Sequence, residues 1–94
     1  MTPLHFAIRN ARVEAASGAV QQARTILKGA TAKARAQGYL GVELEARSAL
    51  VDAEVFHGNR QVGCTLLSGL QRDASKAGFG VVAHDTSPAA SKCR

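Results

Sequence analysis

Two stretches of the chain, AQGYLGVELEA at residues 36–46 and KAGFGVVAHDT at residues 76–86, carry the same pattern forty positions apart. Each contains a glycine, an aromatic residue directly after it, and a valine three residues further on. Glycine readily adopts the left-handed backbone conformation needed just after a helix, and the next side chain can then fold back onto that helix. The pattern therefore predicts helix stops at Gly38 and Gly78, each followed by the start of another element.

Identical residues also recur forty positions apart in other parts of the chain. Matching pairs are Gly18 with Gly58, Gln21 with Gln61, Thr25 with Thr65, Gly29 with Gly69, and Ala34 with Ala74. These matches fall at turns and along helix faces, where a repeated fold restricts the residue type. The interval therefore predicts a structural repeat of about forty residues.

Helix signals divide each repeat into two segments. Thr2 followed by Pro3 is typical of a helix start, and glycine-containing turns separate the segments that follow. The predicted helices lie near residues 3–16, 19–37, 41–57 and 60–77. Because the connections between them are very short, sequential helices must lie antiparallel.

The distribution of apolar residues predicts how these helices pack. Segments 19–37 and 60–77 each carry one apolar stripe, which is typical of burial on a single face. Segment 41–57 carries apolar residues on two sides, with Leu44 on one and Ala53 on the other, so it should be sandwiched. Alternation of these two kinds of helix is expected in stacked helical hairpins.

The predicted fold is all-α: two antiparallel helical hairpins stacked as a short α-solenoid. We expect a single domain over residues 1–85, made of hairpins 3–37 and 41–77. Residues 86–94 are expected to form a flexible C-terminal tail.

From about Leu4 to Val82 the chain resembles a tetratricopeptide-like (TPR-like) repeat, in which a glycine-containing turn joins a helix A to a helix B. The positions that carry the resemblance are Leu50, Gly58, Gly63, Leu67 and Leu70 in one repeat, and Gly18, Ala23, Leu27 and Ala30 in the other. The segments GYLGVELEAR and GFGVVA are also similar to the terminal repeats of bacterial multidomain signalling proteins. The resemblance implies a scaffold that binds a protein or peptide, as the C-terminal part of a larger regulator.

One face of segment 41–57 is the candidate partner-binding face. Glu43, Arg47, Leu50 and Glu54 follow the spacing i, i+4, i+7 and i+11, which places them along one side of a helix. In stacked hairpins the A helices line the concave groove, so these four residues would meet the partner. The alternative is ordinary surface charge, in which Glu43 and Arg47 support the helix by about 0.3 kcal/mol.

Charge and cysteine content give weaker indications. A net charge of +5 is compatible with an acidic partner or nucleic acid, but also with simple solvation, and we disfavour nucleic acid. No run approaches the roughly 18 apolar residues that cross a bilayer, so no membrane contact is expected. Cys64 and Cys93 form no CxxC motif, and no signal peptide is evident. We therefore expect a small packing residue at Cys64, an exposed thiol at Cys93, and a cytoplasmic protein.

Two motifs have the residue types of catalytic sites. The segment GFGVVA from Gly78 has the form of a dinucleotide-binding loop, but a helix rather than a strand is predicted before it. His84, Asp85 and Ser87 are the types found in a hydrolase triad, but such a triad converges from a rigid scaffold. The three histidines lack metal-ligand spacing. The sequence therefore predicts no catalytic, cofactor-binding or metal-binding residues, and no enzyme.

The favoured hypothesis is a non-catalytic protein–protein interaction module. The alternative is a helical homo-oligomerisation unit, because two repeats are fewer than the roughly three that such stacks need, and a two-fold dimer is the commonest closed assembly. A basic nucleic-acid-binding domain is the third hypothesis.

Overall fold

The computed structural model describes residues 3–78 and 87–93. The described chain contains helices and no strand. The helices are α1 (Pro3–Ala16), α2 (Val20–Ala36), α3 (Leu40–His57), α4 (Arg60–Lys76) and α6 (Ser87–Lys92). The prediction of an all-α fold is confirmed, and the first four helices begin and end within one residue of their predicted bounds.

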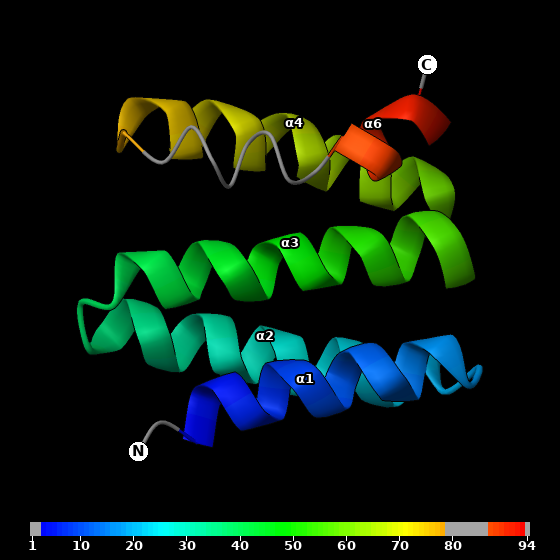
Figure 1. Ribbon diagram of the computed structural model, residues 1–94, viewed down its shortest axis with the longest axis horizontal. Coiled ribbons are helices and arrows are strands. Elements are labelled where there is room, and N and C mark those ends of the chain that lie inside the picture. The colour runs from blue at the N-terminus through cyan, green and yellow to red at the C-terminus, as the bar shows by residue number, and fades with distance from the viewer. Residues whose placement is uncertain (1–2, 79–86, 94) are drawn as a thin grey trace.

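Consecutive helices run antiparallel, and α3 lies in the middle of the molecule (Figure 1). It contacts α1 and α2 on one side and α4 and α6 on the other. Among the described helices, α4 contacts neither α1 nor α2. The first hairpin, α1–α2, therefore meets the second, α3–α4, only through α3.

Helix α2 ends as the opening pattern predicts. Gly38 has a φ of +76°, in the left-handed region. The backbone N–H of Tyr39 donates to the carbonyl of Ala34 at 2.8 Å, and that of Gly38 donates to Arg35 at 3.2 Å. These two bonds are the Schellman arrangement of a helix end. Gly78, with a φ of +82°, ends α4 in the same backbone conformation.

The turn between α3 and α4 requires a glycine for a different reason, which is the lack of room for a side chain. Gly58 has a φ of −129°, which other residues also adopt. The side chain of Asn59 caps α4 by accepting a hydrogen bond from the N–H of Val62 at 3.1 Å. A Cβ at Gly58 would collide with the carboxylate of Glu54, so the glycine allows that side chain to lie across the turn.

The buried apolar side chains form two clusters that meet on α3. The first joins α1 and α2 to one side of α3 and is rich in alanine, including Ala49 and Ala53. The second joins the other side of α3, with Leu44 and Val51, to α4 and α6. The predicted sandwiching of this helix is therefore confirmed.

Residues 87–93 do not form the flexible tail expected over residues 86–94. Helix α6 packs against α3 and α4, and Ala89 is fully buried in the second cluster. Cys64 and Cys93 form a disulfide, with their Cα atoms 5.5 Å apart. The two cysteines are 29 residues apart in the sequence and meet only through tertiary packing, so no local spacing reveals the bond.

The disulfide corrects the prediction of two unlinked cysteines. It also removes the basis for expecting a cytoplasmic protein, because that expectation assumed a reducing compartment. Disulfides persist mainly where the environment is oxidising.

Replacing Gly38 with valine should lower the free energy of unfolding by about 1 to 2 kcal/mol, because a β-branched residue is strained in the left-handed conformation. Urea unfolding followed by circular dichroism measures the loss. The matched control is Gly41→Val, since Gly41 lies within α3 and has no positive φ. Equal midpoints for the two variants would contradict the assigned helix end.

Reducing the Cys64–Cys93 disulfide should lower the free energy of unfolding by about 3.5 kcal/mol, as expected for a bond that closes a loop of this length. Urea unfolding with and without a reductant tests the prediction. Cys93→Ser should unfold like the reduced protein and should not respond to the reductant. A wild-type midpoint unaffected by reduction would show that the bond contributes nothing to stability.

Candidate protein-binding surface

The face predicted to bind a partner is directed into the protein. Glu43, Leu50 and Glu54 are only 7%, 8% and 4% exposed, and Arg47 is partly buried. The physical reason is the central position of α3, which neighbouring helices cover on both sides. Sequence reasoning placed these four residues on one helix face correctly, but that face is not open to a partner. The assignment of this face as a binding site is therefore corrected.

Two charged residues of this face pair with neighbouring helices. Glu43 accepts from the guanidinium of Arg35 on α2 at 2.8 Å. Arg47 pairs with Asp73 on α4 at 3.0 Å. The hydrogen bond to Glu43 raises the pKa of Arg35. These charges therefore join α3 to the helices on either side of it.

Glu54 makes the most enclosed of the described ion pairs, with 5% of its side chain exposed. Arg24 of α2 donates to both carboxylate oxygens, at 2.6 and 2.8 Å, and the N–H of Asn59 donates to one of them at 3.1 Å. The Arg24 hydrogen bonds hold the pKa of Glu54 below its ordinary value, against the opposing effect of burial, and the Asn59 bond adds to the lowering. This bidentate contact fixes α2 to the end of α3.

The part of α3 that reaches solvent lines a shallow groove against α1. The groove is lined by Arg12, Ala15, Ala49, Asp52, Ala53, Phe56 and His57, and we call it the α1–α3 groove. Arg12 donates to Asp52 across it at 2.7 Å, and Phe56 is 41% exposed. A second hollow adjoins it along α1 and shares Arg12. The groove therefore combines an apolar side chain, a floor of alanines and a charged rim.

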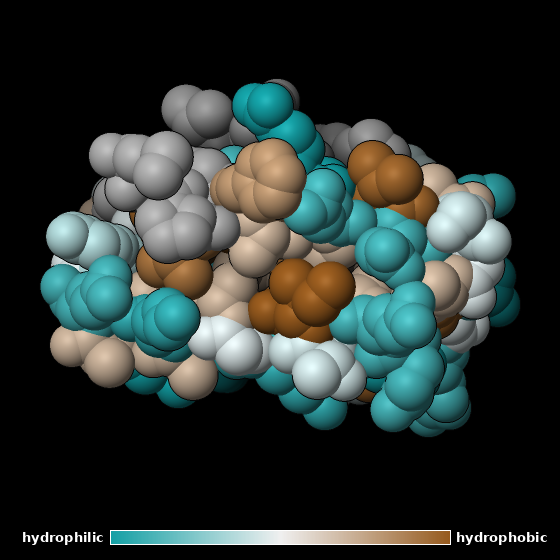
Figure 2. Space-filling view, turned by 90° about the horizontal axis from the view of Figure 1, so that it is seen from below, coloured by the Kyte–Doolittle hydropathy of each residue, from teal (hydrophilic) through white to brown (hydrophobic). Residues whose placement is uncertain are grey.

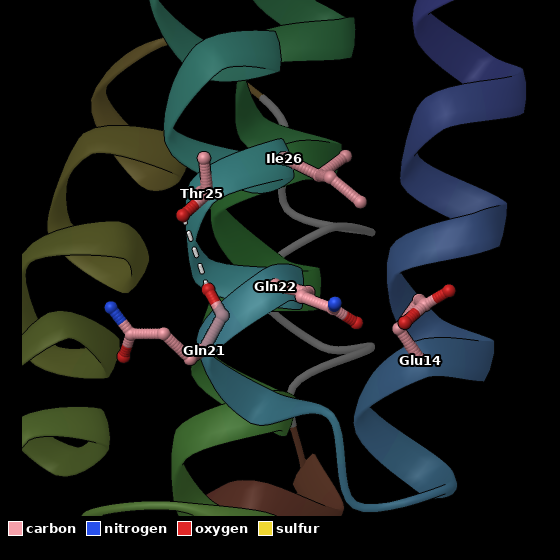
Figure 3. A pocket seen from close by; sticks show the side chains of 5 residues that line it. All are labelled: Glu14, Gln21, Gln22, Thr25 and Ile26. Atoms are coloured by element: carbon pink, nitrogen blue, oxygen red, sulfur yellow. Dashed lines mark hydrogen bonds between the residues drawn. The ribbon is translucent and has the colours of Figure 1, made fainter.

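Another hollow lies on the opposite side of α1, between α1 and α2. Gln22 and Ile26 project from α2 toward the α1 helix that carries Glu14, while Gln21 points the other way (Figure 3). The hollow continues past Ile26 to Lys33. The surface over this hairpin shows apolar patches between hydrophilic ones (Figure 2). This side of the first hairpin has no helix packed on it within the described chain.

The metal, membrane and triad hypotheses considered from the sequence concern other features of the chain. No three histidine, cysteine, aspartate or glutamate side chains among them are grouped so as to hold a metal ion. No described helix is both long enough and apolar enough to cross a bilayer. His84 and Asp85 lie outside the described residues, and Ser87 is the first residue of α6.

Comparisons of the chain with models of known families, with curated proteins and with solved structures found no match. The resemblance to a TPR-like repeat therefore stays a prediction.

Sequence reasoning missed Arg12, Asp52 and Phe56, although one signal pointed to them. Arg12 and Asp52 are forty residues apart and so occupy equivalent positions in the two repeats. In stacked hairpins the first helix of one hairpin lies beside the first helix of the next, here α1 beside α3. Opposite charges at equivalent positions of these two helices therefore indicate a contact. Phe56 follows Asp52 by one helical turn on the same stripe.

The pH dependence of stability should contain a contribution from Glu54. Because its folded pKa is lowered, the contribution is complete above the ordinary value of 4.5 and is lost as the pH falls through the folded pKa. Glu54→Gln should therefore lower the melting temperature at neutral pH much more than at about pH 3. The control is Glu14→Gln, since Glu14 has no ion pair within the described chain. An equal effect of Glu54→Gln at both pH values would refute the assignment.

Proposed function

We propose that the chain is a non-catalytic protein–protein interaction module of the TPR-like type, which docks an apolar side chain of a protein or peptide into the α1–α3 groove. The observation that carries this proposal is the exposed side chain of Phe56 in a groove that is otherwise lined by small alanines and a charged rim. The proposal keeps the predicted class of function and moves the site from the buried face to this groove.

The size and composition of the groove favour a side chain over a small-molecule ligand. It encloses about 110 Å³, well below the ~300 Å³ at which drug-sized ligand pockets begin. Ala15, Ala49 and Ala53 line its bottom and are themselves nearly buried, so Phe56 supplies most of its exposed apolar surface. A leucine- or phenylalanine-like anchor that covers the exposed side chain of Phe56 would remove apolar surface from water. The charges of Arg12 and Asp52 at the rim would orient polar groups on either side of the anchor.

The ion pairs of the structure weaken the nucleic-acid alternative. Five of the eight arginines, Arg12, Arg24, Arg35, Arg47 and Arg72, pair with carboxylates within the described chain. Phosphate contacts need cations that are free to displace counterions. The net charge of +5 is therefore a poor measure of the basic surface that a nucleic acid would meet.

The resemblance noted from the sequence supports one further element of the proposal. It suggests that recognition uses the A helices, here α1 and α3. The tie between α4 and α6 through a disulfide favours an oxidising compartment over the cytoplasm.

Selection from a displayed library of random peptides tests the proposed groove. Enriched peptides should share one large apolar residue, and Phe56→Ala should weaken their binding by about tenfold or more, as expected for a central aromatic contact. The matched control is Leu66→Ala, which removes an exposed apolar side chain from α4, away from the groove. Binding that survives Phe56→Ala but not Leu66→Ala would place the site elsewhere, and no enrichment at all would argue against the function.

A further inference from the structure

The two ends of the helix stack are finished differently. At one end α6 packs against α3 and α4, and a disulfide fixes it to Cys64. At the other end the first hairpin presents Phe6 and Val13, which are 68% and 66% exposed. We call this end the N-terminal face and define it by Phe6, Val13 and Glu14 of α1 with Ile26, Gly29 and Lys33 of α2.

The repeat shows what this face would contact if it were covered. Phe6 and Val13 are equivalent, forty residues on, to Ala46 and Ala53. Those two residues are buried in the cluster that joins α3 to the hairpin before it. Phe6 and Val13 therefore occupy positions that serve helix packing in the second repeat, but they have no helix against them in the described chain.

Glu14 gives the same indication through charge. Its equivalent, Glu54, is paired with Arg24 of the preceding hairpin. Glu14 has no cation within the described chain, and it stands at one end of the hollow between α1 and α2. Lys33, which also lacks an ion pair there, stands at the other end. The hollow is thus acidic at one end, apolar at Ile26 in the middle, and basic at the other end.

Gly29 lies in the same stripe of α2 as Ile26 and Lys33. A glycine inside a helix costs about 1 kcal/mol relative to alanine. A Cβ at Gly29 would meet nothing within 4 Å, so packing inside the described chain does not require the glycine. Its small size is suited to the close approach of a helix from another molecule.

We propose that the N-terminal face is a homodimer interface, covered by the same face of a second copy of the chain. A two-fold axis near Ile26 places Glu14 of each copy opposite Lys33 of the other, so the charge pattern is complementary to itself. The side chain of Ile26 would then lie over Gly29 of the other copy. This dimer goes beyond peptide binding in the α1–α3 groove, and leaves Phe56 outside the interface.

The dimensions of the molecule permit such a dimer. In the plane of Figure 2 the whole molecule extends 31 by 16 Å, an outline of about 500 Å² that bounds the area of this face. This is near the ~600 Å² per partner of the smallest stable interfaces. A head-to-tail stack would need the α3–α4 end to be free, and α6 occupies that end. A two-fold dimer in which the N-terminal faces of two copies meet is therefore compatible with the structure, whereas a head-to-tail stack is not.

Sedimentation velocity of the full 94-residue chain tests the dimer. The wild type should show reversible dimerisation at micromolar to submillimolar concentration. Gly29→Gln should weaken it by about tenfold or more, a loss typical of central interface positions, while helix content stays the same or rises. The control is Gly69→Gln, at the equivalent position of α4, which should dimerise like the wild type. A wild-type chain that stays monomeric throughout this range overturns the proposal.

Charge reversal tests the geometry separately from folding. Glu14→Lys and Lys33→Glu should each dimerise more weakly than the wild type, because each places like charges opposite one another. An equimolar mixture should recover association, because both facing pairs in the mixed dimer are then of opposite charge. If the mixture associates no better than either variant alone, the two-fold arrangement is wrong. Loss of peptide binding with dimerisation intact would instead count against the α1–α3 groove alone.

Discussion

The burial of α3 on both sides is the constraint on which the rest of the structure depends. The first hairpin meets the second only through this helix among the described contacts, so the side chains of α3 must satisfy two interfaces at once. Its alanines allow close approach on one side, while Leu44 and Val51 fill the other. Any charge on the covered faces needs a partner, because an unpaired buried charge is costly. Glu43 and Glu54 meet that need through arginines of α2, and the ion pairs thereby fix the register between the hairpins.

Local sequence patterns predicted the helices and their ends, because the formation and the end of a helix depend on residues that are close in the sequence. Gly38 stops α2 through its own backbone conformation, and the two-sided apolar pattern of residues 41–57 follows from burial on two sides. The partner-binding face was mispredicted for a related reason. Helical spacing shows which residues share a face, but it does not show which face a neighbour covers. Glu54 belongs to the interior because Arg24 reaches it from another helix thirty residues earlier.

The disulfide also shows that a local sequence pattern does not reveal which part of the chain a residue contacts. Cys64 is equivalent in the repeat to Arg24, which ties α2 to α3 through Glu54. At the end of the stack the equivalent position ties α4 to α6, with a covalent bond in place of an ion pair. The same repeat position therefore links its helix to a neighbouring helix in both repeats, by an ion pair in the first and by a disulfide in the second. Alignment of the two repeats would show the position, but only the packing of α6 shows what is bound there.

The two proposed surfaces share α1, and this has an energetic consequence. Phe6 and Val13 face away from the core, while Ala15 and Arg12 on another side of the same helix line the α1–α3 groove. The small side chains of the first cluster bury little apolar area each, so the position of α1 against α3 depends on modest contacts and on the Arg12–Asp52 pair. A second copy that holds α1 in place would reduce the freedom a peptide must otherwise restrict. By thermodynamic linkage, a peptide bound in the groove would strengthen the dimer by the same factor.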